Sequence, residues 1–306
     1  MRPRVEAAVL LVLCASATGC RGEEPGGGRE GLLAADSAAA GDMLYETLAD
    51  EAWYLAPGRP VMSRREVVAR GENDAPEGRV ERTPLVAGVS SDGSHGYTAG
   101  RVVEHGVSGT GAIHGKYLAY WRHAPDTGWR IWAYVESASP ATPDTVPAAA
   151  ARAHAAHPAA APRRAGGPDR LIAADSAFSA RSAASRAALA FRAYAEPQAL
   201  TLLGAGHGMV WGDSAIGAYF GEAIPAGDAL TWSPRLARLA PSGDLGFTIG
   251  DAAYRHVPAD GAEQYSYTKY LTVWRRQADG SWRYAADGGN AQPAPEDSVG
   301  RGHAGR

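Results

Sequence analysis

The sequence has few cysteines, little excess charge and no long apolar run, and each of these shortages excludes a class of protein. Only two of the 306 residues are cysteine, Cys14 and Cys20, and both lie near the N-terminus. The rest of the chain therefore has neither a disulfide framework nor a thiolate metal site. The formal net charge is −3. We expect no nucleic acid partner, because binding to phosphates needs a basic face and no Lys or Arg cluster occurs in the predicted domains.

The first 20 residues have the pattern of a secretion signal. Arg2 and Arg4 precede an apolar run from Ala7 to Ala17, which is too short to span a bilayer comfortably. Small residues then lead to Cys20, an arrangement that resembles the bacterial lipoprotein signal, in which this cysteine carries lipid. An ordinary secretion signal and a retained anchor are the alternatives.

The resemblance implies a signal peptide over residues 1–19 and a lipidated Cys20 that attaches the protein to a membrane. Residues 20–30 are rich in Gly and predict a flexible tether. Arg21 fits retention at the outer membrane, so the expected location is the bacterial cell envelope, on the outer membrane facing the periplasm.

Most of the remaining chain consists of two copies of one domain sequence. Lys116–Pro140 and Lys269–Pro293 align without a gap, and 11 of the 25 positions are identical, which is far above chance. Both segments predict a β-hairpin, with a turn at Ala278-Asp279-Gly280 in the second copy. Trp121, Trp129, Trp274 and Trp282 belong to these hairpins, where we expect them to be structural.

Two further blocks repeat in the same order. Leu32–Ser37 and Leu171–Ser176 share the letters A-A-D-S, and G-Y-T-A-G at 96–100 returns as G-F-T-I-G at 246–250. The repeat divides the chain into a first domain (31–140), an Ala- and Pro-rich, semi-extended linker (141–168), a second domain (169–293) and a disordered tail (294–306).

Each domain begins with an Ala-rich sequence in which apolar residues recur at helical spacing, and segments typical of β-strands follow. Ser63 and Glu66 predict a capping box for a short helix, and Gly212 precedes another helix start. This order predicts an α+β fold with N-terminal helices packed on a curved antiparallel sheet.

The hairpin with its two tryptophans, the two G-x-T-x-G segments and the opening A-A-D-S together resemble the nuclear transport factor 2-like (SnoaL-like) superfamily. The nearest match is the domain of unknown function 4440 family. This resemblance implies two tandem cone-shaped domains, each with a pocket at its wide mouth. Some members of the superfamily are isomerases, cyclases or dehydratases, while others only bind or dimerise. The two copies are therefore expected to pack sheet to sheet as a pseudo-dimer, and a homo-oligomer is an alternative.

Asp287 is the leading candidate for a catalytic carboxylate. A three-residue bulged turn would place Leu271 opposite Asp287, on one sheet face with Val273 and Ala285. A carboxylate among apolar neighbours has a raised pKa and can act as a general acid or base. The alternative is that Asp287 ends a strand and accepts hydrogen bonds from the turn that follows it.

Aromatic residues at equivalent positions of the two copies are candidates for lining a ligand pocket, although aromatics at alternating strand positions also form cores. The predicted ligand-binding residues are Tyr97, Tyr117, Tyr134, Phe247, Tyr270 and Asp287. No metal site and no cofactor is expected, because His105, His114 and His123 are scattered and have no counterparts in the second copy.

The copies share scaffold residues but, judged from the sequence, no common set of titratable groups. This pattern favours an envelope lipoprotein with two pocketed domains that bind a small apolar molecule, or a partner, without catalysis. The alternative is an isomerase-, cyclase- or dehydratase-like enzyme with only the second copy active. In that case Asp287 would move a proton and Tyr270 would donate a hydrogen bond to a developing oxyanion.

Overall fold

The computed structural model describes residues 28–41, 43–69, 79–106, 111–142, 145–156, 166–259 and 261–295. The predicted signal peptide, Cys20 and most of the predicted tail lie outside these residues, and so does the first part of the predicted tether, whose last three residues begin a helix. No helix in the described ranges combines the length and the apolarity needed to cross a membrane.

The first half consists of short helices and a six-stranded sheet with the order β2-β1-β6-β5-β4-β3. Its capping box is confirmed, because the Ser63 backbone N–H donates to Glu66 Oε2 at 2.7 Å. The elements are α1 (Gly28–Ala38), α2 (Met43–Thr47), β1 (Leu48–Leu55), β2 (Met62–Ser63), α3 (Arg64–Ala69), β3 (Arg79–Val89), β4 (His95–His105), β5 (Ile113–Ala124) and β6 (Gly128–Ala138).

The second half repeats this architecture with longer helices and the strand order β8-β7-β12-β11-β10-β9. Its predicted helix start at Gly212 is also confirmed, since this residue precedes a helix. The elements are α5 (Asp169–Ser185), α6 (Ala187–Tyr194), β7 (Ala195–Leu202), β8 (Met209–Trp211), α7 (Asp213–Ala223), β9 (Ala229–Leu239), β10 (Leu245–His256), β11 (Gln264–Arg276) and β12 (Trp282–Ala291).

The expected α+β class with two tandem units is therefore present, but the sheets are mixed rather than purely antiparallel. The hairpins pair antiparallel, whereas β1 runs parallel to β6 and β7 runs parallel to β12. In each half the parallel pair joins the first strand of the sheet to its last strand, so a long stretch of chain separates the two partners, as a parallel pair requires.

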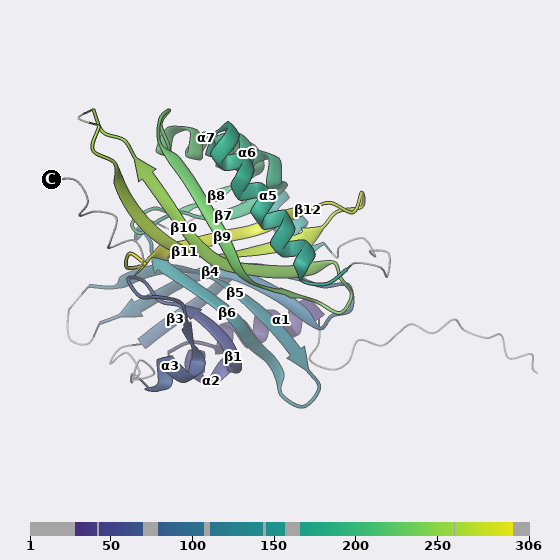
Figure 1. Ribbon diagram of the computed structural model, residues 1–306. Coiled ribbons are helices and arrows are strands. Elements are labelled where there is room, and N and C mark those ends of the chain that lie inside the picture. The colour runs from purple at the N-terminus through teal and green to yellow at the C-terminus, as the bar shows by residue number, and fades with distance from the viewer. Residues whose placement is uncertain are drawn as a thin grey trace, which may run out of the picture.

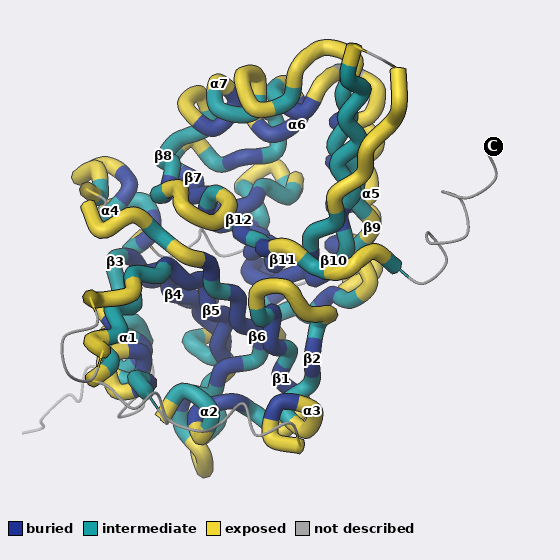
Figure 2. Tube along the Cα trace, turned by 90° about the vertical axis from the view of Figure 1, so that its left-hand side faces the viewer, coloured by how far each residue is buried: buried dark blue, intermediate teal, exposed yellow. Residues whose placement is uncertain are grey.

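The two sheets face each other in the middle of the molecule, with α5–α7 on one outer side and α1–α3 on the other (Figure 1). The most deeply buried backbone follows the central strands (Figure 2). One apolar cluster contains residues of both halves, and Tyr120 and Phe247 meet within it at a ring-centroid distance of 4.6 Å. The expected sheet-to-sheet packing is thus confirmed.

Two turns extend this pseudo-symmetric contact. The Ser91 N–H donates to Asp244 Oδ2 at 2.9 Å, and the Ser242 N–H donates to Asp92 Oδ2 at 2.7 Å. Each half thus satisfies a backbone donor in the turn of the other half.

The predicted semi-extended linker contains a helix, α4 (Ala148–Ala155), which packs against β3 and β7 and so touches both halves. His154 on this helix is buried, with Nδ1 2.7 Å from the Tyr97 hydroxyl and Nε2 3.0 Å from the Gln198 carbonyl oxygen. The linker was predicted to be semi-extended because of its prolines, but the alanine-rich stretch between two of them is long enough to form two helical turns.

Candidate functional site

The second half holds a cavity of about 470 Å³ between helices α5–α7 and the sheet face that these helices cover. The first half closes part of its rim through Pro57, Ser137 and Ala138. Lys116 of the first half also fixes the rim, because its Nζ donates to the carbonyl oxygens of Gly204 and His207 at 3.2 and 2.8 Å. The cavity is therefore a feature of the whole two-domain chain.

Six aromatic residues contribute to the cavity wall. Phe178 lies 4.5 Å from Trp232 and 4.9 Å from Phe191 between ring centroids, and Phe191 stacks on Phe220 at 3.6 Å. These rings come from α5, β9, α6 and α7, so every layer around the cavity contributes one. Such a wall suits an apolar ligand.

Asp287 and Tyr270 both line this cavity. The expected pairing of Asp287 with Leu271 is wrong, because a bulge between Val273 and Trp274 shifts the register so that Asp287 lies opposite Thr272. One extra residue turns every following side chain to the other sheet face. Asp287 thereby leaves the face of Leu271 and Val273, which pack in the inter-sheet cluster, and joins Tyr270 on the cavity face.

Asp287 accepts a hydrogen bond from Thr272 Oγ1 at 2.6 Å. Burial, helped by the nearby Asp175 carboxylate, raises the pKa of Asp287 to about 7, although hydrogen bonds from the Thr272 hydroxyl and the Gly288 N–H oppose the rise. Near neutral pH this carboxyl group therefore exists in both protonation states, and it can exchange a proton or accept a cation.

Asp175 lies directly behind the cavity wall and is fully buried. Its carboxylate accepts hydrogen bonds from the Tyr270 hydroxyl at 2.8 Å and from Trp232 Nε1 at 2.7 Å. Burial raises the pKa of Asp175 to about 6, against the hydrogen bonds of Thr248, Tyr270 and Trp232. The Thr248 hydroxyl in turn accepts from Trp274 Nε1 at 2.8 Å.

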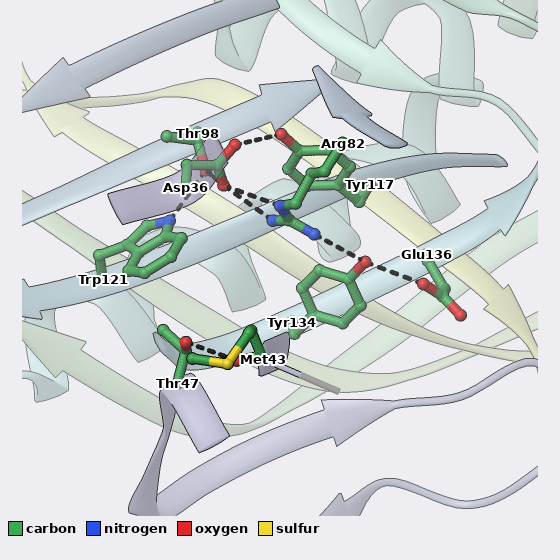
Figure 3. A network of polar contacts seen from close by, with 9 residues as sticks. All are labelled: Asp36, Met43, Thr47, Arg82, Thr98, Tyr117, Trp121, Tyr134 and Glu136. Atoms are coloured by element: carbon green, nitrogen blue, oxygen red, sulfur yellow. Dashed lines mark hydrogen bonds and ion pairs between the residues drawn. The ribbon is translucent and has the colours of Figure 1, made fainter. Parts of the chain in front are cut away.

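The first half contains the same network around Asp36 (Figure 3). Thr98 Oγ1 donates to Asp36 Oδ1 at 2.8 Å, the Tyr117 hydroxyl donates to Asp36 Oδ2, and Trp121 Nε1 donates to Thr98 at 2.8 Å. The expectation that the copies share no set of titratable groups is therefore wrong. The repeated A-A-D-S was the available signal for Asp36 and Asp175, which the sequence analysis did not select as site residues.

The copies differ in what fills the space between the helices and the sheet of each half, which we call the cone. Arg82 occupies the first-half position that corresponds to Trp232, and its guanidinium contacts Asp36 at 2.8 Å. Tyr134 occupies the position of Asp287, accepts a hydrogen bond from Arg82 at 3.1 Å and stacks on Tyr54 at 5.4 Å. The space left beside Arg82 and Tyr134 is about 130 Å³, so the first cone is largely filled by its own side chains.

The other predicted pocket residues are buried in packing contacts. Tyr97 and Phe247 lie in the cluster between the sheets rather than in a pocket, because their strand parity points them to the other half. Tyr117 and Tyr134 pack inside the filled first cone, where their rings stack at 6.0 Å. Of the predicted ligand-binding residues, only Tyr270 and Asp287 line the large cavity.

Among the described residues, no three His, Cys, Asp or Glu side chains cluster in a way that could hold a metal ion. His105 lies on β4, 3.4 Å from Glu81, and His123 packs on Trp129. His154 packs at the inter-half boundary, where burial lowers its pKa to about 3, so it is neutral at ordinary pH.

No family model matches this sequence, and no curated protein matches it significantly. Solved structures resemble it over less than half of its length. An NTF2-like protein with a cystatin-like fold from Novosphingobium aromaticivorans is 14% identical, with a TM-score of 0.36, over 43% of this chain and 86% of its own.

A ketosteroid isomerase-like protein from Erwinia carotovora atroseptica is 18% identical, with a TM-score of 0.33, over 40% of this chain and 97% of its own. The CaMKII hub of S. rosetta is 16% identical, with a TM-score of 0.34, over 41% and 97%. The fold class follows from this structure itself, which has two tandem α+β units, each with helices before a six-stranded mixed sheet.

Proposed function

We propose that this protein binds a small, largely apolar molecule in the cavity of its second half, with one polar group of the ligand beside Asp287. The observation that carries this proposal is the contrast between the copies. The same fold leaves about 470 Å³ beside Tyr270 and Asp287 in the second half, and about 130 Å³ at the equivalent place beside Arg82 and Tyr134 in the first half. The first half then acts as a wall and a support for the rim.

The chemistry of the cavity supports a ligand with an apolar body and one polar end. Its volume lies in the range of pockets that hold small organic ligands. Phe178, Phe191, Phe220 and Trp232 offer apolar contact, and each methylene group of a ligand buried there contributes about 0.8 kcal/mol. Asp287 provides the polar contact and so orients the ligand.

A second candidate is an enzyme that moves a proton within this cavity, for example an isomerase, cyclase or dehydratase. The observation that favours it is the Asp287 pKa of about 7 on a cavity wall, which suits a general acid or base. Burial raises the pKa of Tyr270 well above its usual value, so Tyr270 stays protonated. Its hydroxyl proton is directed to Asp175, however, and an oxyanion would have to compete for it.

Binding is tested with N-phenyl-1-naphthylamine, a neutral apolar probe whose fluorescence rises in an apolar site. The Ala252→Phe variant places a ring inside the cavity, and we expect it to weaken probe binding at least tenfold. Leu189→Phe places the same ring on the exposed face of α6, away from the cavity, and should leave binding unchanged. Equal binding by wild type and Ala252→Phe would exclude this cavity as the site.

We also propose, from the N-terminal sequence, that the protein is located in the bacterial envelope and attached there by a lipid anchor. The support is the apolar run from Ala7 to Ala17 followed by Cys20. Mass spectrometry of the N-terminal peptide from membranes should find acyl chains on Cys20. An unmodified Cys20 within an uncleaved leader would overturn the proposal.

A further inference from the structure

The cone of the first half already contains a cation. The Arg82 guanidinium is buried there, donates to Asp36 at 3.2 and 2.8 Å, and lies 3.5 Å from the centroid of the Tyr117 ring. Tyr134 presents a second ring 5.2 Å away (Figure 3). A buried cation is stabilised by a carboxylate that pairs with it and by aromatic faces that contact it, and the Arg82 guanidinium has both.

The second cone keeps the surroundings but has no such cation. Trp232 stands in the position of Arg82, and Asp175 keeps the hydrogen bonds from tyrosine and threonine that Asp36 has. Asp287 adds a second carboxyl group where the first half has a tyrosine. Among the described residues that line this cavity, none is Lys, Arg or His.

We propose that the ligand of the second half is a hydrophobic amine, whose ammonium group lies against Asp287 and whose apolar body packs on the aromatic wall. This inference rests on the proposed binding function and specifies its ligand class. The ligand would supply to the second cone the positive charge that Arg82 supplies to the first. Phe178, Phe191, Phe220 and Trp232 would receive the ammonium substituents through cation–π and apolar contacts.

The groups that face Asp287 from the surrounding elements agree with a cationic ligand. Asp175 on α5 is acidic, and Tyr270 on β11 and Tyr284 on β12 are neutral phenols. Tyr219 on α7 is a further phenol on the wall. The two lysines near the rim donate to backbone carbonyl oxygens: Lys269 Nζ to that of Ala291 at 3.0 Å and Lys116 Nζ to that of Ala138 at 2.7 Å.

The sign of the pH dependence separates a cationic ligand from a neutral one. An ammonium group needs ionised Asp287, so its affinity should fall about tenfold for each pH unit below the Asp287 pKa of about 7. A neutral ligand that accepts a hydrogen bond from protonated Asp287 should instead bind more tightly as the pH falls. An anionic ligand would meet like charge at every pH above 7.

The test uses three molecules with one skeleton: 4-phenylbutylamine, 4-phenylbutanol and 4-phenylbutyrate. Calorimetric titration of the protein at pH 8 should give an affinity for the amine at least tenfold above that for the alcohol, and no measurable binding of the carboxylate. Amine affinity should fall about 100-fold at pH 5. Asp287→Asn should remove the preference for the amine while the alcohol still binds.

The outcomes distinguish the two proposals. If the alcohol binds as tightly as the amine, or if amine binding strengthens at pH 5, the amine proposal is overturned while the apolar binding site stands. If neither the naphthylamine probe nor any of the three molecules binds, both proposals are overturned. The wild-type titrations decide this even if Asp287→Asn does not fold.

Discussion

Replacing Asp175 by Asn should change how the stability of this protein depends on pH. Asp175 is fully buried, and burial raises its pKa from 3.8 to about 6. A carboxyl group with a raised pKa in the folded state favours folding at low pH. That contribution is fully present below pH 3.8 and is lost as the pH rises to about 6.

The change from 3.8 to about 6 corresponds to about 3 kcal/mol, since one pKa unit is worth 1.36 kcal/mol. Asn at this position does not ionise, so the variant lacks this loss. Between pH 4 and pH 8 the free energy of unfolding of Asp175→Asn should therefore improve relative to wild type by about 2 to 3 kcal/mol. Above pH 7 the difference should be constant.

Urea unfolding followed by tryptophan fluorescence and circular dichroism, from pH 4 to pH 8, measures this difference. Asp36→Asn is the matched control, because it leaves the buried Arg82 guanidinium without its carboxylate. The control should be less stable than wild type at pH 8 by about 3–5 kcal/mol. Parallel pH profiles for wild type and Asp175→Asn would refute the assignment of a raised pKa to this residue.

Two further predictions concern the support of the site. Gly250→Ala should cost about 3 kcal/mol and disturb Tyr270, because the added methyl group would lie 2.2 Å from the Ser233 carbonyl oxygen and 2.6 Å from the Tyr270 hydroxyl. Gly221→Ala on α7, where the nearest atom is 3.5 Å away, should be tolerated, and urea unfolding of the two variants measures the difference. Lys116→Met should cost about 2 kcal/mol, because it removes the buried charged donor of three hydrogen bonds to carbonyl oxygens of both halves. Hydrogen exchange should quicken at residues 203–208 in this variant, and unchanged protection there would contradict the assigned role of Lys116.

The elements that were predictable from the sequence depend on local patterns. The hairpin turn before Trp282, the capping box at Ser63 and Glu66 and the helix start at Gly212 are each encoded within a few residues, and the structure contains all three. The duplication was also visible, because insertions between the matched blocks did not disturb the blocks themselves.

The identity of the site depended on contacts that no local pattern records. Asp36 is 62 residues from Thr98 and 81 from Tyr117, its hydrogen-bond partners. The A-A-D-S repeat showed that the aspartate recurs, but only the folded chain places it beneath a tyrosine in both cones. The bulge at Val273 and Trp274 likewise decided which sheet face carries Asp287.

The sequence by itself determined that one α+β unit occurs twice. It also determined that the second copy has Trp232 and Asp287 where the first copy has Arg82 and Tyr134. The tertiary structure alone decided that one cone is open and the other filled, and that Tyr97 and Phe247 face the opposite sheet. The physical reason is that hydrophobic periodicity specifies an element from neighbours along the chain. Cavity volume, strand register and the pairing of buried charges arise between residues that meet only after folding.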